Sequence, residues 1–458
     1  MDINEEDLET IVSEVFTKVQ NKPRKPREAP DALSLFQKEL HSLQPEEPVT
    51  EYTKCTDKHG FVCCVTGIGG PFYSSAYIEE FARGLSMLFR CMRDIFEPKH
   101  ECPTIIRTNK RGIILTELYG LLFIFVAQPS PTFIFHQNFD QEKISFFCQA
   151  FNAIFFEDNL KMVSNRYNSL QFSKAFGFLL NGLYDSSNQD ISFLFGALPI
   201  HPMAFNGRKI IEIFSYKTLP KNVYLAIFLY KKQLVSIFIS NKISRIDYSD
   251  IVMIYSIVEK MPDSLATGSC YIPLVLQSID PVAAFHLFVN NRRVDDGFDM
   301  GLLHAPKEGI PNGKLSNFVD DFYEIISSDL MIKSAVRLCL TTPYPKGKPK
   351  LEFVTNFIVV YHDKRLPQYH SSMSDDEFQR YKQIYMEMFL RSKYSVSSFT
   401  FTHEFSTLYF KSKNENFSFY CLANPFLSEY QIDKLCEELI NSLPLIFRPI
   451  IANSYLLL

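Results

Sequence analysis

The sequence predicts an α+β protein of three small domains, each a five-stranded antiparallel sheet with flanking helices, after a flexible N-terminal tail. The chain of 458 residues is too long for a single hydrophobic core and would divide into domains of roughly 130 residues. Its 46% hydrophobic and 21% charged residues are typical of a globular protein. An order of two strands, one helix, three strands and two helices then recurs along the chain, which favours a repeated domain.

The predicted tail covers residues 1–55, which are charged, rich in proline and poor in long apolar runs. Its clearest linker is the stretch NKPRKPREAP at 21–30. Two short stretches, 8–19 and 34–43, have apolar residues at helical spacing, and the second opens with a Ser34-x-x-Gln37 capping box. They are either fraying helices of a mobile tail or helices that dock on a partner or on the chain itself.

The first domain is expected at 58–203, where short apolar runs alternate with turn residues. Its expected strands are 61–66, 72–75, 104–108, 113–118 and 121–127. Its expected helices are 78–96, 141–163 and 170–184. The first of these helices should bury one face, because its apolar residues recur every three or four positions. That face holds Ile78, Phe81, Leu85, Leu88, Phe89, Met92 and Phe96.

The second domain is expected at 208–335 and repeats the order with looser signals. Its expected strands are 223–230, 234–240, 271–276, 283–289 and 300–305. Its expected helices are 248–260 and 315–327. In the first of these helices Ile251, Ile254, Tyr255 and Val258 should point inward.

The third domain is expected at 345–456. Its expected strands are 354–362, 395–402, 405–411 and 417–422. Two helices should begin at capping boxes, Ser374 with Glu377 and Ser428 with Gln431. The hairpin that opens the other two domains has no clear second strand here.

Charge and targeting signals narrow the class of protein. A net charge of −4 disfavours a chain that neutralises nucleic-acid phosphates over its whole surface. The ten cysteines include no C-x-x-C pair and lie mostly in apolar stretches, so we expect core thiols in a reducing, cytosolic compartment. Neither a secretory signal nor a lipidation motif is recognisable, and prolines break the longest apolar run. Membrane contact would therefore run through partners or a surface patch.

Motifs for catalysis are not recognisable, and we expect neither a metal nor a cofactor. The Gly-rich turn at 67–70 has Phe72 where a phosphate-binding loop would need its third glycine. The histidines are dispersed and lack a companion ligand at metal spacing. An enzyme whose Ser, His and Asp meet only in the folded chain stays an alternative. Small basic clusters at 107–111, 292–293 and 346–350 are either solvated loop charge or a patch for anionic lipid or an acidic partner.

The chain resembles the Mon family, whose members form the larger subunit of the Mon and Ccz exchange-factor complex of late endosomes and vacuoles. The residues that carry the resemblance to its first longin domain are FVCCVTGIGGPFYSS at 61–75. The stretch FLFGALP at 193–199 is similar to the end of that domain, and NFIVVYHDK at 356–364, with the helix after it, is similar to the last third. The similarity spans about 58–447 in patches.

This resemblance implies three longin, or roadblock/longin-like, domains, the first of which pairs with a Ccz-like longin subunit. The heterodimer would act as a guanine nucleotide exchange factor for a late-endosomal or vacuolar Rab GTPase, in endosome maturation, autophagy and vacuole or lysosome fusion. The chain would be cytoplasmic and peripheral on those membranes. Exchange makes and breaks no bond: a factor that prefers the nucleotide-free GTPase weakens nucleotide binding by the same ratio.

Five residues are expected to contact the partner or the GTPase: Arg83, Arg90, Arg93, Phe72 and Tyr73. The three arginines belong to the helix at 78–96, and their charges are not needed for its packing. A solvated helix face is the alternative for them. The edge strands of the first sheet are the expected dimer seam, because unpaired edges invite pairing. A second class of function stays open, a scaffold or tether in vesicle traffic that lacks exchange activity.

Overall fold

The computed structural model contains residues 1–458. The placements described below cover 61–66, 71–74, 104–107, 112–126, 133–155, 205–240, 246–260, 269–290, 298–304, 312–328, 354–362, 366–373, 398–403, 406–413 and 417–446, with separate residues within 84–91, 180–201, 242–243 and 377–389. The predicted tail at 1–55 and its two helical stretches lie outside these residues.

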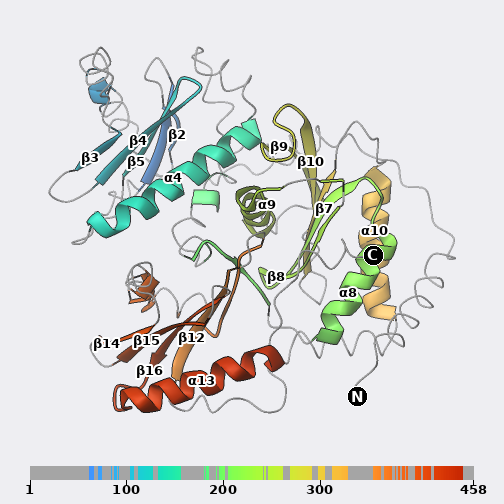
Figure 1. Ribbon diagram of the computed structural model, residues 1–458. Coiled ribbons are helices and arrows are strands. Elements are labelled where there is room, and N and C mark those ends of the chain that lie inside the picture. The colour runs from blue at the N-terminus through green and yellow to red at the C-terminus, as the bar shows by residue number, and fades with distance from the viewer. Residues whose placement is uncertain are drawn as a thin grey trace, which may run out of the picture.

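The chain is an α+β protein, as the sequence predicts, and its described part contains three sheets (Figure 1). The first has the order β2-β1-β5-β4-β3. Its strands are β1 (Phe61–Val65), β2 (Pro71–Ser74), β3 (Ile105–Arg107), β4 (Gly112–Leu118) and β5 (Leu121–Val126). All neighbouring strands in it are antiparallel.

The second sheet has the order β8-β7-β11-β10-β9 and is also antiparallel throughout. Its strands are β7 (Val223–Tyr230), β8 (Gln233–Ile239), β9 (Ser269–Val275), β10 (Ala284–Asn290) and β11 (Phe298–His304). The third sheet has the order β14-β15-β16-β12-β13-β6. Its strands are β12 (Val354–Tyr361), β13 (Gln368–Ser371), β14 (Ser398–His403), β15 (Ser406–Lys413), β16 (Phe417–Ala423) and β6 (Leu198–Pro199).

One strand order therefore occurs three times. In each sheet the first two strands form a hairpin, the third lies at the far edge, and the fifth returns to pair with the first. The third sheet differs only by β6, which arrives from a distant part of the chain and pairs in parallel with β13. We call each sheet with its helices a unit.

Two hairpin turns need left-handed backbone at both central residues. Tyr119 and Gly120 have φ of 52° and 78° between β4 and β5, and Lys231 and Lys232 have φ of 47° and 65° between β7 and β8. Positive φ at both positions is the type I′ geometry, whose twist suits a two-residue hairpin. The lysines lack the freedom of glycine there, and the hydroxyl of Tyr255 donates to the carbonyl of Lys232 at 2.8 Å, which holds that turn.

Helices cover both faces of the first sheet. Helix α4 (Phe133–Phe155) packs Phe147 and Phe151 against Phe123 of β5. On the opposite face Phe89, in a helical segment within 84–91, joins the side chains of Phe61 and Ile124. The first sheet is therefore the middle layer of its unit.

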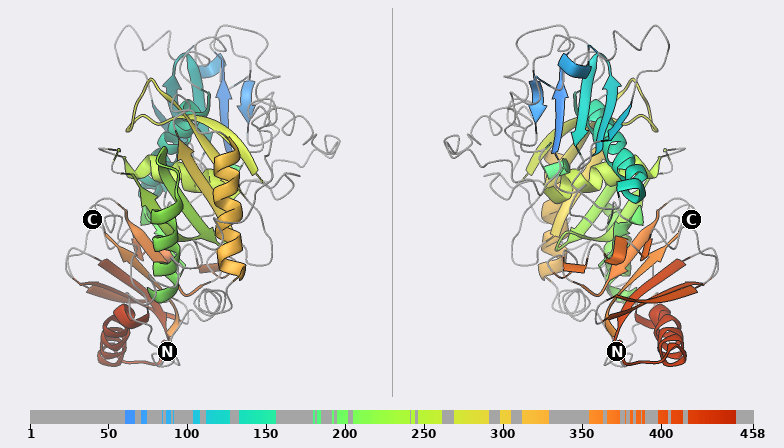
Figure 2. Two further views of the ribbon diagram at one scale, coloured as in Figure 1. Left: turned by 90° about the vertical axis from the view of Figure 1, so that its right-hand side faces the viewer. Right: turned by 90° about the vertical axis from the view of Figure 1, so that its left-hand side faces the viewer.

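The second sheet is covered in the same manner. Helices α8 (Phe205–Thr218) and α10 (Asn312–Ser328) lie side by side on one face, where Phe214 meets Phe318 and Phe322 at ring distances of 5.5 and 5.2 Å (Figure 2). Helix α9 (Tyr248–Lys260) covers the other face. Every residue of α9 from Asp250 to Glu259 is buried.

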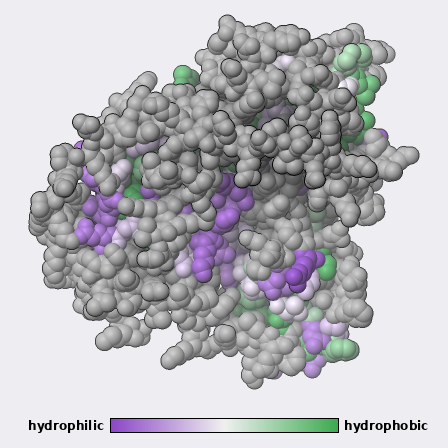
Figure 3. Space-filling model, turned by 180° about the vertical axis from the view of Figure 1, so that it is seen from behind, coloured by the Kyte–Doolittle hydropathy of each residue, from purple (hydrophilic) through white to green (hydrophobic). Residues whose placement is uncertain are grey.

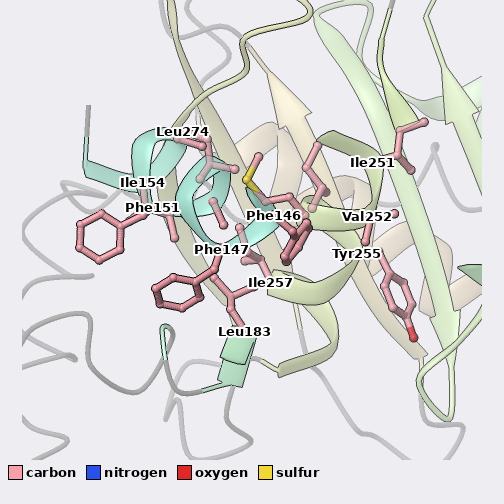
Figure 4. Packing of buried hydrophobic residues seen from close by; sticks show 14 of the residues in the cluster. Phe146, Phe147, Phe151, Ile154, Leu183, Ile251, Val252, Tyr255, Ile257 and Leu274 are labelled. Carbon is pink, nitrogen blue, oxygen red and sulfur yellow. The ribbon is translucent and has the colours of Figure 1, made fainter. Parts of the chain in front are cut away.

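The first two units share one hydrophobic core, because α4 and α9 pack against each other between the two sheets (Figure 4). Phe146 of α4 points toward α9, whereas Phe147 and Phe151 point away from α9 and meet Phe123 of the first sheet. Burial of this shared apolar surface stabilises the contact between the units by roughly 25 cal/mol per Å² removed from water.

A partly buried polar network joins the same two helices. Gln149 Nε2 of α4 donates to Ser249 Oγ and to Asp250 Oδ1, both at 3.1 Å, across the interface. Ser278 donates to the other carboxylate oxygen of Asp250 from its backbone N–H and its hydroxyl. Burial raises the pKa of the Asp250 carboxyl, and these donors oppose the rise. The network satisfies a carboxylate that would otherwise be costly to bury.

The third unit has helices on both faces of its sheet. Helix α13 (Glu429–Ile446) packs Ile432, Cys436 and Leu439 on one face, and Tyr385 and Met388 lie on the other. The capping box at the start of α13 is confirmed: the Gln431 N–H donates to Ser428 Oγ at 3.3 Å, and the Ser428 N–H donates to Gln431 Oε1 at 2.9 Å.

Residues 198–201, which we call the bridging strand, connect the second and third sheets. The N–H groups of Leu198 and Ile200 donate to Pro367 and Tyr369, both at 2.9 Å, and that of His201 donates to Leu234 at 2.9 Å. The sequence places this stretch at the end of the first domain, up to residue 203. Its hydrogen bonds instead join edge strands β13 and β8.

Three differences from the predicted elements have physical causes. Helix α4 begins at Phe133, not at residue 141, because it starts directly after the prolines of the apolar run. Helix α8 was not predicted, although Ile210, Ile211 and Phe214 have helical spacing. Strand β13 was not recognised because its residues, QYHS, are mostly polar.

Gly301 of β11 allows α9 to approach the second sheet, so we expect Gly301→Ala to destabilise the chain. A Cβ at this position would lie 2.5 Å from Val258 Cγ2, and overpacking of a tight core costs about 1–3 kcal/mol. Urea unfolding measures the change in the free energy of unfolding. Gly84→Ala is the matched control, because nothing lies within 4 Å of its added Cβ. Equal effects of the two changes would contradict the proposed close approach.

Candidate interaction surface

Four exposed residues form a stripe along the helical segment within 84–91 of the first unit. They are Gly84, Met87, Leu88 and Cys91, at the i, i+3, i+4 and i+7 positions that share one side of a helix. The exposed fraction is 69% for Met87 and 54% for Leu88. None of the four is charged, so we call this set the exposed stripe.

The opposite side of the same segment attaches it to the sheet. Phe89 is buried among Phe61, Cys63 and Leu115 of the first sheet. The prediction that Phe89 points inward is confirmed, and the prediction that Leu88 does so is wrong. Adjacent positions on a helix differ by about 100°, so the face that buries Phe89 turns Leu88 toward solvent.

Surface hydrophobicity is also visible in space-filling representation. Seen from behind, the molecule has hydrophobic residues at the surface on the side of the first unit, at the upper right of the view (Figure 3). Scattered apolar residues on a surface are ordinary, but contiguous ones mark interaction sites. Met87 and Leu88 are adjacent in sequence and both exposed, which makes the exposed stripe a candidate interaction site.

The predicted contact residues divide into three groups. Tyr73 is buried, with its ring stacked on Phe147 at 5.6 Å, so its assignment as a contact residue is wrong: β2 turns it toward α4. Phe72 lies in β2, and its side chain lies outside what can be described. Arg83, Arg90 and Arg93 are outside the described residues and stay predictions.

The spacing of apolar and uncharged residues in the sequence also indicates the exposed stripe. The spacing of Gly84, Met87, Leu88 and Cys91 is as regular as that of the predicted inward face, and both faces include Leu88. A helix with apolar residues on two sides has more hydrophobic surface than one sheet can cover. The excess is a sequence-level indication of a second contact.

Two of the described aromatic side chains of the third unit are exposed. Phe426, in the turn before α13, is 92% exposed, and Tyr430, in the first turn of α13, is 77% exposed. They lie on the third unit beside acidic Glu429. They provide a comparison for the stripe, since their chemistry is similar and their location is different.

The buried thiols of the first unit do not resemble nucleophiles. Burial raises the pKa of both Cys63 and Cys148 to about 12, so each is protonated at neutral pH. A reactive cysteine needs the opposite environment, which lowers the thiol pKa. Cys63, Cys64 and Cys148 therefore act as core residues, as the sequence predicts.

Within the described ranges, no three His, Cys, Asp or Glu side chains come together where they could hold a metal ion. Among the described helices, none combines the length and apolar character that crossing a bilayer requires. No protein-family model matches the chain, and no curated protein matches it.

Charges placed on the exposed stripe should leave the fold intact. We expect the double change Met87→Asp and Leu88→Asp to alter the free energy of unfolding by less than about 0.5 kcal/mol per residue, because both side chains face solvent. Phe89→Ala, one position away, should cost about 3–5 kcal/mol, because it empties part of the core. Urea denaturation compares the variants. A loss for the double change as large as that for Phe89→Ala would show that the stripe is covered within the chain.

Proposed function

We propose that the chain is the Mon-like subunit of a heterodimeric guanine nucleotide exchange factor for a late-endosomal or vacuolar Rab GTPase. In this proposal its three units are longin domains, and it works in the cytoplasm, peripherally on late-endosome and vacuole membranes. The observation that carries the proposal is the strand order common to the three sheets, together with the Mon-like residues at 61–75.

In place of the edge strands of the first sheet, which the sequence analysis expects as the dimer seam, the proposal takes the exposed stripe as the surface for the second subunit. A Ccz-like longin subunit would cover Met87 and Leu88 and remove them from water. Interface centres favour methionine and other apolar side chains and are poor in charge, which describes the stripe. The first unit then contributes one half of a surface that neither subunit has alone.

The predicted GTPase contacts belong to the same helix. Arg83 precedes Met87 by four positions, and Arg90 follows it by three, so spacing predicts that they flank the stripe. Arginine at the rim of an apolar contact gives orientation and faster association more than affinity. In the proposal, Met87 and Leu88 hold the Ccz-like subunit, and Arg83, Arg90 and Arg93 meet the acidic side of the GTPase.

Exchange activity measured with the partner tests the function. The chain co-purified with a Ccz-like subunit should accelerate release of fluorescent GDP from a late-endosomal Rab, and the chain alone should not. Acceleration requires tighter binding to the nucleotide-free GTPase than to the loaded one. If the complex binds Rab equally well loaded and empty and accelerates release from none of the endosomal Rabs, the exchange function is wrong and the tether is the better description.

The stripe has its own test within the same assay. Met87→Asp with Leu88→Asp should abolish co-purification of the Ccz-like subunit and reduce GDP release to the rate of the Rab alone. The matched control is Phe426→Ser with Tyr430→Ser, which removes two exposed aromatic side chains from the third unit and should leave release unchanged. Normal pairing in the stripe variant would exclude the stripe as the seam without excluding exchange activity.

A further inference from the structure

The junction between the second and third units contains an unusual set of buried ionisable groups. His201, Arg208 and His370 are all buried, with exposed fractions of 7%, 4% and 3%. They come from the bridging strand, from α8 and from β13, so each belongs to a different element. These three groups carry positive charge or can acquire it.

The bridging strand is held by backbone hydrogen bonds to two sheets and by buried apolar side chains. Three N–H groups, those of Leu198, Ile200 and His201, bond to the third and second sheets at 2.9 Å. His201 Nδ1 also lies 3.1 Å from Gln233 Oε1 of β8. Leu198 and Ile200 are buried in the shared core, so the attachment depends on these apolar side chains, on the backbone hydrogen bonds and on the polar side chains beside them.

We propose that the bridging strand is an acid-sensitive connection: uptake of a proton by His370 detaches it from the edges of the second and third sheets. The inference is independent of the exchange function. It concerns how the two units are held together, and it needs only the chain itself.

The surroundings of His370 favour its neutral form. It lies beside the ring of Phe357 at 6.0 Å and opposite Val359 of β12, both apolar. Burial first, and the neighbouring His201 second, lower the pKa of His370 to about 4, and a backbone hydrogen bond with Ile200 opposes this. In the detached state His370 meets water and regains an ordinary pKa near 6.5.

Charges on the neighbouring elements give little compensation. Arg208 Nη2 of α8 donates to the carbonyl of His201 at 3.2 Å, which already fixes one cation at the junction. Glu212 is the carboxylate that acts on Arg208. On the β7 and β8 side the facing groups are Tyr230, whose ring lies 5.0 Å from that of His201, and the uncharged Gln233.

The direction of the pH effect follows from the lowered pKa. The attached state binds fewer protons than the detached state between about pH 6.5 and 4, so attachment is strongest above that range and weakens as the pH falls. With a pKa of about 4 attached and about 6.5 detached, the detachment constant rises about 30-fold between pH 7.5 and 5.0.

Hydrogen exchange of the full chain, read by mass spectrometry with single-residue resolution, tests the proposal. After correction for intrinsic rates, protection of the Leu198, Ile200 and His201 amides should fall about 30-fold from pH 7.5 to 5.0. Amides between β7 and β11 should keep their protection. Unchanged protection of the bridging strand, or an equal loss in β7 and β11, would overturn the proposal.

Variants isolate the responsible histidine. In His370→Leu the protection of the bridging strand should be the same at both pH values, because the variant lacks the side chain whose protonation the proposal makes responsible. His370→Gln replaces it where the leucine variant does not fold. His286→Gln, which removes a half-buried histidine of β10 whose pKa burial also lowers, is the matched control and should keep the 30-fold fall. If the protection of the bridging-strand amides still depends on pH in the folded His370 variants, the proposal is wrong.

Discussion

Helix α9 is enclosed on all sides, and the arrangement of the first two units depends on that enclosure. One side packs on the second sheet, where Gly301 lets it come close, and another packs on α4 of the first unit. The helix order of the two units is the same, yet the packed helices are not equivalent: α4 follows the fifth strand of its sheet, whereas α9 follows the second. The contact is therefore asymmetric, and it leaves the segment within 84–91 of the first unit on the outside.

That asymmetry determines which helical faces of the two units are exposed. In the second unit, α9 follows the hairpin and is covered by its contact with α4. The corresponding helical segment of the first unit, within 84–91, keeps an exposed stripe with Met87 and Leu88. Among the described residues, units with the same strand order therefore have different exposed faces, and in the first unit the exposed helical positions are uncharged.

Much of the fold was predictable from the sequence, because short apolar runs indicate strands and apolar residues at regular helical spacing indicate helices. The bounds of β7 and α9 match the prediction at Val223–Tyr230 and Tyr248–Lys260. The prediction was less successful in deciding which side chains of a helix or strand point into the core and which point toward solvent. Leu88 and Tyr73 were placed on the wrong side, because periodicity defines a face but not which neighbour it meets. Residues such as Val252 and Met253, apolar on the other side of α9, were the signal that this helix is buried all round.

The contacts between units were the least predictable part, because they depend on polar residues and on distant segments. Strand β13 pairs through QYHS, and Gln368, although polar, is wholly buried with its Nε2 donating to Leu366. Nothing in local periodicity distinguishes such a strand from a loop. The bridging strand pairs with residues that lie more than 150 positions later in the sequence: Leu198 pairs with Gln368. Besides the burial of Leu198 and Ile200, its attachment includes hydrogen bonds and, in our proposal, the neutral form of a buried histidine, two features that hydrophobic patterns do not report.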